Sequence, residues 1–281
     1  MPRKIKDAVA YMVIYLAAFY SVLLLAGIIV YVFAKGFPVF DLPFFTTVSS
    51  VVKGTVGIAG NILNTVYIVV LTLLAAVPAG VGAAVWLNEY ATPGRGVRLI
   101  EFATETLAGI PSIVFGLFGM MFFGTTLGFG YSILTGSLTL SLMILPLITR
   151  NTQEALRAVP DSYRNGAIGM GAGKWHMIRT ILLPSAMPGI VTGILLAVGR
   201  IVGESAALLF TAGSGYLLPE AGSGFVSKIM ESGGTLTIQM YLSLARAEYD
   251  TAFGIAAVLL CIVLAFNLLI KILTRNKFFA G

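Results

Sequence analysis

Long runs of apolar residues, separated by shorter polar segments, dominate the hydropathy pattern of this chain. A helix needs roughly 20 apolar residues to cross the core of a bilayer, and six runs come close to that length. They cover Ala8–Ala34, Ile62–Leu87, Leu107–Gly124, Tyr131–Ile148, Met187–Ala212 and Ala252–Leu273. Prolines occur within several runs, and membrane helices tolerate them where neighbouring helices satisfy the freed carbonyls. The pattern predicts an all-α integral membrane protein with six transmembrane helices.

Composition supports a membrane protein and excludes several kinds of site. Charged residues make up 11% of the 281 positions, far below the roughly 25% of soluble domains. One cysteine and one histidine exclude an internal disulfide and a metal site rich in either residue. The net charge of +6 is spread between the apolar runs, which favours membrane topology over nucleic-acid binding. The first run is too long for a cleaved signal peptide and predicts an uncleaved anchor.

The distribution of lysine and arginine predicts the orientation. With six spans, 13 of these residues fall on the side that holds both chain ends, 4 fall on the opposite side, and Arg200 lies within a span. Because positive charge concentrates on the cytoplasmic side, both termini are expected in the cytoplasm.

The longest cytoplasmic segment, residues 150–184, has the pattern of a short docking element. It breaks at Pro160, Asp161 or Ser162 can cap a new short helix, and glycines then permit a turn. The next helix carries apolar residues at helical spacing, at Trp175, Ile178, Ile181 and Leu182. Such a helix suits a groove in a partner protein; an amphipathic loop lying on anionic lipid is the alternative.

The stretch GMGAGKW does not form a nucleotide site of its own. A phosphate-binding loop needs the pattern G-x4-G-K-[ST] after a strand. Counted back from Gly173 and Lys174, the first position is Ile168 and the last is Trp175. Neither fits, so ATP hydrolysis by this chain alone is not expected.

The spacing within this loop resembles the EAA loop of bacterial ABC importer permeases, EAA-x3-G-x9-I-x-L-P. Gly171 is followed by nine residues and then by Ile181-x-Leu183-Pro184. The EAA positions hold Asn-Gly-Ala, so the acid of the pattern is absent. The resemblance implies that the loop couples the chain to a cytoplasmic ATPase through Asn165, Gly166, Ala167, Gly171, Lys174, Trp175, Ile181, Leu183 and Pro184.

Arg200 and Glu204 lie inside the fifth apolar run. A charge at mid-span costs about 2.5–3.5 kcal/mol on insertion scales, so both side chains are expected to face a polar interior. Residues four apart on one helix can pair, and Gly199 and Gly203 would let another helix approach closely. One interpretation is a self-neutralising pair that locks helix packing. The other is an oxyanion site. There the arginine would bind the oxyanion bidentately, and the glutamate would accept a hydrogen bond from hydrogen phosphate, which still carries a proton.

Three polar residues at the start of the second run, Asn61, Asn64 and Thr65, are expected to cap the helix rather than line an outer mouth. Glu101 and Glu105, at the edge of the third run, are expected on a solvated cytoplasmic face.

Two longer stretches resemble the PstA-type permeases of bacterial phosphate ABC importers. They are LPSAMPGIVTGILLAVGRIVGESAALLFTAG and TLTIQMYLSLARAEYD, with Thr237 where proline is usual. The resemblance covers about residues 60–275 and implies a type I ABC importer permease fold. Residues 1–60 would then form the first helix and first extracytoplasmic loop, 61–275 the permease core with the coupling loop, and 276–281 a cytoplasmic tail. A phosphate path is implied near Arg200 and Glu204.

The same resemblance implies the partners. They are a second permease subunit of PstC type, two copies of a PstB-type ATPase, a PstS-type phosphate-binding protein outside, and the lipid bilayer of the bacterial cytoplasmic membrane. ATP and magnesium would be bound by the ATPase, and this chain would hold no cofactor, metal, nucleic acid or catalytic residue. Alternatives are an importer of sulfate, molybdate or phosphonate, and a stand-alone secondary carrier, although the sequence has no inverted repeat. A membrane enzyme is a third class of protein to consider, but the sequence shows no group of residues arranged as a catalytic site.

Overall fold

The computed structural model describes residues 3–50, 55–92, 94–219 and 224–278. Its elements run in the order α1 (Arg3–Gly36), η1 (Phe37–Val39), α2 (Leu42–Thr46), β1 (Val48–Ser50), β2 (Thr55–Ile58), α3 (Ala59–Val85), η2 (Trp86–Tyr90), α4 (Arg95–Gly109), α5 (Ser112–Gly119), η3 (Met120–Thr126), α6 (Ile133–Arg157), α7 (Asp161–Gly169), α8 (Lys174–Met177), η4 (Ile178–Leu182), α9 (Leu183–Gly203), α10 (Ala206–Thr211), α11 (Phe225–Ile229), α12 (Leu236–Ala245) and α13 (Tyr249–Phe278). Of these, η1 is a 3-10 turn, and η2, η3 and η4 are π-helical turns.

The predicted membrane class and helical architecture are confirmed. In the described part of the chain, five helices are long and apolar enough to cross a membrane, and the bent pair formed by α4 and α5–η3 makes a sixth if it counts as one span. Within the described residues, strands occur only in the small antiparallel hairpin of β1 and β2. Where a cytoplasmic tail was expected over residues 276–281, α13 continues to Phe278, and residues 279–281 lie outside the described part. The side of the membrane on which the termini lie stays a prediction.

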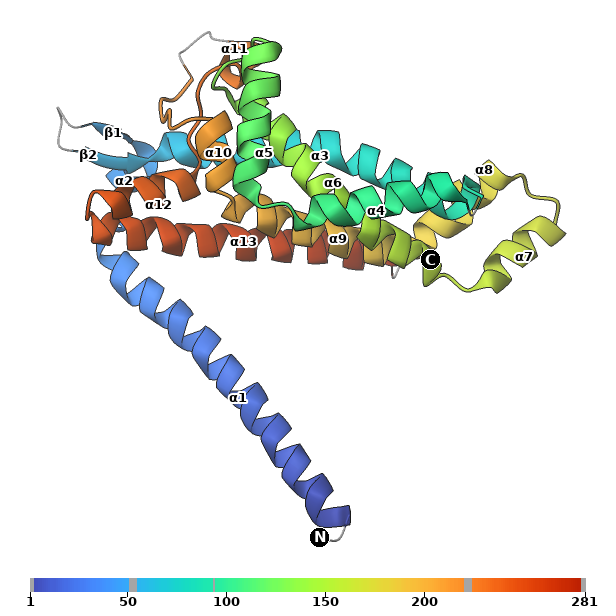
Figure 1. The fold of residues 1–281 in the computed structure, drawn as a ribbon. Coiled ribbons are helices and arrows are strands. Elements are labelled where there is room, and N and C mark those ends of the chain that lie inside the picture. The colour runs from blue at the N-terminus through green and yellow to red at the C-terminus, as the bar shows by residue number, and fades with distance from the viewer. Residues whose placement is uncertain (1–2, 51–54, 93, 220–223, 279–281) are drawn as a thin grey trace.

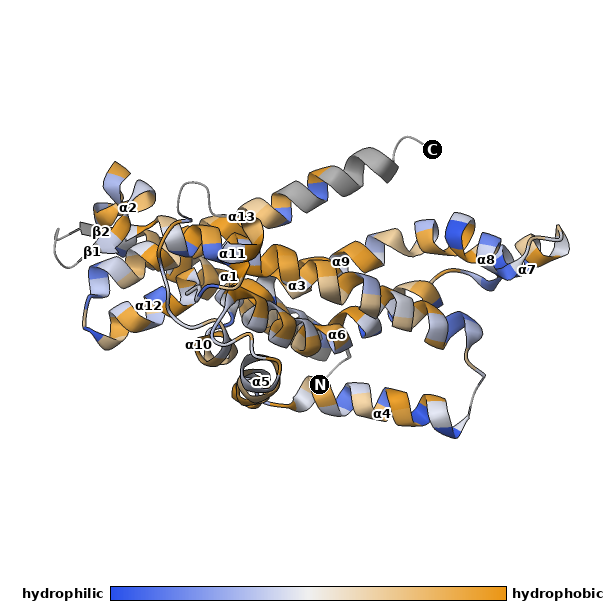
Figure 2. Cartoon of the chain, turned by 90° about the horizontal axis from the view of Figure 1, so that it is seen from above, coloured by the Kyte–Doolittle hydropathy of each residue, from blue (hydrophilic) through white to orange (hydrophobic). Residues whose placement is uncertain are grey.

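The third apolar run is not the single helix that its composition predicts. The axis turns by 102° between α4 and α5, because Pro111 disfavours a helical conformation at the residue before it. Ile110 is extended there, with φ −73° and ψ 132°. As a result α4 lies along the bundle while α5 stands across it (Figure 1). In Figure 2, hydrophilic residues gather on α4 and around α7 and α8.

The fifth apolar run is also broken. Helix α9 ends at Gly203, and Glu204 is extended with ψ 129° before α10 begins. Breaks inside a bundle are tolerated where other groups satisfy the freed backbone. Here the Thr237 hydroxyl lies 3.2 Å from the carbonyl oxygen of Val202 and 3.1 Å from that of Glu204. The Thr237 hydroxyl therefore supports the break.

Helix α6 lies at the centre of the bundle, with α3, α4 and α9 packed around it. Its contact with α9 is close because glycines face it. A Cβ added at Gly193 would lie 2.7 Å from the Asn151 Cβ, and one at Gly189 would lie 2.6 Å from the Ala155 Cβ. The close approach predicted at Gly199 and Gly203 does not occur within the described part of this chain, because a Cβ added at either position would meet no other segment within 4 Å. An approach by a helix of a partner stays a prediction.

Three buried polar residues of α3 hold the segments on either side of α11. The Asn61 side chain donates to the carbonyl of Gly234, and that of Asn64 donates to the carbonyl of Gly215, each at 2.9 Å. The Thr65 hydroxyl accepts from the backbone N–H of Leu236 at 3.0 Å. The predicted capping role is therefore wrong, since these side chains tie two distant segments to α3 instead.

Helix α1 leaves the bundle and extends away from it (Figure 1). It meets α13 near its own C-terminal end, where the Tyr31 and Phe253 rings lie 5.6 Å apart edge to face. Gly36 sits against the Phe253 backbone, with room for no side chain. The first helix is therefore attached to the rest of the chain through the last one.

The α6–α9 contact can be tested with two matched substitutions. Gly193→Ala places a methyl group against Asn151, and overpacking of this kind costs about 1–3 kcal/mol. Gly199→Ala adds the same methyl group to the same helix in open space. In thermal unfolding of the purified protein we expect Gly193→Ala to lower the Tm and Gly199→Ala not to lower it. Equal effects would show that the two helices do not pack as described.

Candidate substrate path and docking loop

Arg200 lies in the last turn of α9, and its side chain lines a cavity of about 190 Å³ between α4, α6 and α9. The polar residues around it come from α4 and α6. They are Thr104, Arg150, Asn151 and Glu154. Arg200 is exposed in the single chain. The guanidinium thus faces a polar hollow and is not sealed in a dry helix contact.

The predicted ion pair between Arg200 and Glu204 is wrong. Glu204 follows the end of α9, so the helical spacing that would bring the two side chains together does not exist. Its Oε1 instead accepts from the backbone N–H of Ala207 at 3.1 Å, where a carboxylate is favoured by the dipole at the start of α10. Among the described residues Arg200 has no carboxylate partner, so its charge stays uncompensated within this chain.

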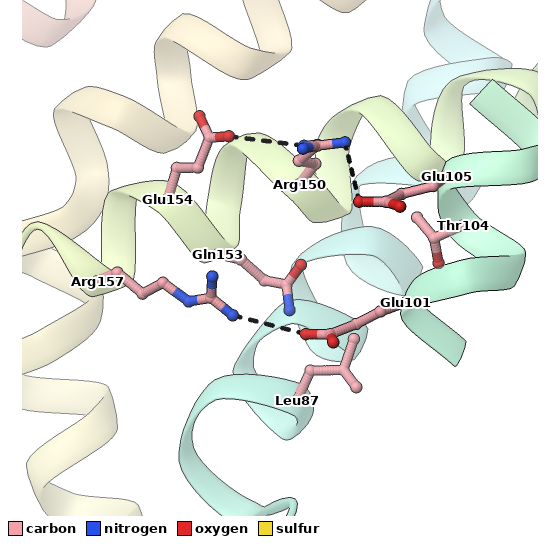
Figure 3. Close-up of a pocket in the computed structure, with 8 residues that line it drawn as sticks. All are labelled: Leu87, Glu101, Thr104, Glu105, Arg150, Gln153, Glu154 and Arg157. Carbon is pink, nitrogen blue, oxygen red and sulfur yellow. Dashed lines mark ion pairs between the residues drawn. The ribbon is translucent and has the colours of Figure 1, made fainter. Parts of the chain in front are cut away.

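A second cavity of about 230 Å³ continues the polar surface toward α7. Two ion pairs cross it from α4 to α6: Glu105 with Arg150 and Glu101 with Arg157, each at 3.6 Å. Gln153 lies between them (Figure 3). The two glutamates expected on a solvated face are thus paired with arginines. The side chains of these pairs are 42–63% exposed, and exposed pairs contribute roughly 0–1 kcal/mol, so they can exchange partners at little cost.

The two cavities share Thr104, Arg150 and Glu154, so Arg150 borders both. Of the three arginines that line them, Arg150 and Arg157 already have glutamate partners, whereas Arg200 has none among the described residues. An incoming oxyanion would therefore meet the least competition at Arg200.

In the predicted docking segment, residues 150–184 (the docking loop), α7 is a separate short helix and a tight glycine turn follows it, as predicted. The second short helix is wrong, because α8 continues through η4 into α9 as one helix from Lys174 to Gly203. Gly171 adopts φ +79° in this turn, a conformation that side-chain-bearing residues disfavour. The predicted cap is wrong: Pro160 occupies the N-cap of α7 without a side-chain hydrogen bond, and Asp161 lies within the first turn.

The loop residues divide into an outer and an inner set. Exposed are Asn165, Gly166, Gly171, Lys174, Trp175 and Pro184; Ile181 and Leu183 are half-buried, and Ala167 is buried. The apolar face expected to meet a partner mostly turns inward, because Ile178 and Leu182 are fully buried against Leu156 of α6. Two exposed apolar residues at the tip, Ile168 and Met170, were missed. The one feature of the sequence that could have pointed to them is the group of glycines around them.

A comparison with known families matches residues 76–276 to the family described as binding-protein-dependent transport system inner membrane component. The chain belongs to this family. The family expected from the EAA-type spacing is thereby confirmed, and with it the nature of the chain as a membrane-embedded permease component.

Three relatives are 33–39% identical to this permease over their aligned parts. A probable ABC transporter permease protein of Bacillus subtilis, YqgI, is 39% identical over 76% of this chain and 72% of its own length. A phosphate transport system permease protein PstA of Xylella fastidiosa is 35% identical over 75% of this chain and 73% of its own. PstA of Mycobacterium leprae is 33% identical over 95% and 88%.

Solved structures share the fold at low identity. A bacterial alginate ABC transporter, in complex with a periplasmic protein bound to an alginate pentasaccharide, aligns with TM-score 0.70. The alignment covers 97% of this chain and 96% of that chain at 15% identity. An inward-facing conformation of the MetNI methionine ABC transporter aligns with TM-score 0.59 over 78% and 94%, at 18% identity. The type I ABC importer permease fold is confirmed.

The capping role of Glu204 can be separated from its charge. Glu204→Ala removes the acceptor for the α10 N-terminus, at a cost of about 1 kcal/mol, and we expect a lower Tm. Glu204→Gln keeps an oxygen in the same place and should stay close to the unmodified protein. Thermal unfolding of the three proteins in one detergent measures this, and equal losses in both variants would contradict a hydrogen-bonded cap.

Proposed function

We propose that this chain is the transmembrane permease subunit of an ATP-driven importer of inorganic phosphate in the bacterial cytoplasmic membrane. Several relatives named as phosphate transport system permeases support the substrate. The observation that carries the proposal is the position of Arg200: an uncompensated guanidinium that lines a polar cavity among three helices.

The path would bind the anion by charge-assisted hydrogen bonds. Arg200 offers a planar fork of donors that matches an oxyanion. Arg150 lines the same cavity and is held by weak, exposed ion pairs to Glu105 and Glu154. Its side chain can therefore turn toward an anion that has bound at Arg200. Neutralising the charge of the anion in stages, first at Arg200 and then at Arg150, would let it pass toward the α7 end of the bundle.

Glu204 would help to select the anion. One of its oxygens caps α10, while the other accepts no hydrogen bond from the described residues. Hydrogen phosphate still carries a proton that it can donate to a carboxylate, whereas fully deprotonated sulfate would be repelled. An importer of sulfate, molybdate or phosphonate is the alternative, and the anion that stimulates ATP hydrolysis in the assembled complex distinguishes them.

ATP chemistry would belong to partner subunits. The proposed complex contains a second permease of PstC type, two PstB-type ATPases that bind ATP and magnesium, and a PstS-type phosphate-binding protein outside. The exposed residues Asn165, Gly166, Lys174 and Trp175, with Met170 at the tip, would contact an ATPase. A stand-alone carrier would purify without any nucleotide-binding subunit.

Removal of the free guanidinium tests the path. Arg200→Gln should abolish phosphate uptake by the reconstituted complex without reducing the amount of ATPase that co-purifies. Arg200→Lys keeps the charge but not the fork, so we expect partial uptake. Arg98→Gln removes an exposed guanidinium of α4 that lines neither cavity and should leave uptake unchanged. Normal uptake by Arg200→Gln would remove this residue from the path.

The turn of the docking loop offers a second test. Gly171→Val forces a β-branched residue to φ +79°, a strain of about 1–2 kcal/mol, and should reduce ATPase binding or its stimulation by loaded binding protein. Gly173→Val introduces the same side chain two residues on, where φ is −66° and nothing lies within 4 Å. It should behave as the unmodified protein. Unchanged stimulation in Gly171→Val would count against docking through this loop.

A further inference from the structure

The side chain of Arg164, in α7, reaches back from the docking loop into the bundle. Its Nη1 donates to the carbonyl of Val159 at 2.9 Å and to Asp161 Oδ1 at 3.1 Å. Its Nη2 donates to the carbonyl of Leu156 at 2.9 Å and to Glu89 Oε1 at 3.0 Å. One guanidinium therefore joins α7, the C-terminal end of α6 and the π-helical turn η2 that extends α3.

The pair with Glu89 is nearly enclosed, unlike every other ion pair of the docking loop or the cavities in the described part of the chain. The Glu89 side chain is 6% exposed and that of Arg164 is 18% exposed. If the Arg164 charge is lost, the Glu89 carboxylate is left buried without a counter-charge among the described residues, which is far more costly than losing an exposed pair. If Glu89 is lost, Arg164 keeps Asp161 as its acidic partner. Asp161, the other acidic partner of Arg164, is 86% exposed and carries no such penalty.

A second contact reinforces the joint one residue further along η2. The Lys174 ammonium, at the start of α8, lies 4.8 Å from the centroid of the Tyr90 ring, within the range of a cation–π interaction. The helices on both sides of the glycine turn are thus fastened to η2: α7 through Arg164, and the helix that continues from α8 into α9 through Lys174. The apolar contacts of the loop are non-directional, whereas the four donated bonds of Arg164 fix an orientation.

We propose that Glu89 and Arg164 are positioning residues that transmit movement of the docking loop to α3 and α6. The inference rests on the proposed docking of an ATPase at this loop. A displacement of α7 pulls on η2 through Glu89 and on the end of α6 through Leu156. Helix α6 carries Arg150, which borders the Arg200 cavity, so the movement reaches the proposed anion path along two helices that pack extensively on each other.

The first experiment compares transport with hydrolysis in the reconstituted four-component complex, with inorganic phosphate as the probe. Glu89→Gln keeps the shape of the side chain but not its charge. In this variant ATP hydrolysis should persist, while the amount of phosphate taken up per ATP hydrolysed should fall about fivefold, which is at the low end of the fold-changes typical of coupling between sites. Arg164→Lys, which keeps the charge but not the fork, should fall similarly. The matched control Asp161→Asn removes the exposed partner of the same arginine and should keep the normal ratio.

Two results would overturn the proposal. One is an unchanged ratio of phosphate to ATP in both Glu89→Gln and Arg164→Lys. The other is an equal fall in Asp161→Asn, since the effect would then come from the charge around Arg164 and not from the enclosed pair. A purely structural role would lower complex yield or Tm without changing this ratio.

A second measurement needs no transported anion. Spin labels are attached at Trp86→Cys in η2 and Ile168→Cys in α7, both exposed, after Cys261→Ser removes the native thiol. We expect the distance between the labels to stay constant between nucleotide-free and ATP-bound complexes, and to broaden in Glu89→Gln. If the distance between the labels changes with ATP while Glu89 is present, the proposed connection of α7 to η2 is contradicted. A wrong substrate would leave this result intact, and failure of docking would appear separately as the absence of co-purified ATPase.

Discussion

The close contact between α6 and α9 determines where this bundle can hold charge. Asn151 and Ala155 face glycines of α9, and Ile148 faces Gly80 of α3, where an added Cβ would lie 2.8 Å from it. Such approaches leave no volume for charged side chains. Because residues of a helix advance by 3.6 per turn, Arg150 and Arg157 are left on the remaining side, toward α4. The polar cavities therefore lie on that side, and Arg200 opens onto them from the end of α9.

Much of the fold could be predicted from the sequence because the bilayer imposes a length on each apolar run. The positions of the helix breaks could not be predicted from composition. In the fifth run, apolar residues continue on both sides of Glu204, so composition gives no sign of a break there. The hydroxyl that supports the break comes from Thr237, 33 residues further on. The expected pairing of Arg200 with Glu204 depended on an unbroken helix, and it failed for that reason.

The docking loop was predicted from a spacing pattern, and that pattern correctly placed the short helix α7 and the glycine turn, but not the continuous helix from Lys174 to Gly203 that follows. It did not reveal which face each helix presents. Ile178 and Leu182 have the periodicity of a contact surface, but periodicity is the same whether the covering surface is a partner or the chain itself. Glu89 had no local signal at all, since it lies 75 residues from Arg164 in a turn that reads as the end of an apolar run.

The attachment of α1 also has a consequence for the order in which the chain is assembled. A ribosome delivers the first helix long before the last, yet the residues that receive Tyr31 and Gly36 lie around Phe253 in α13. Contacts between such distant parts of a sequence form late. During synthesis α1 must therefore reside in lipid, or against another polypeptide, until more than two hundred further residues have been translated.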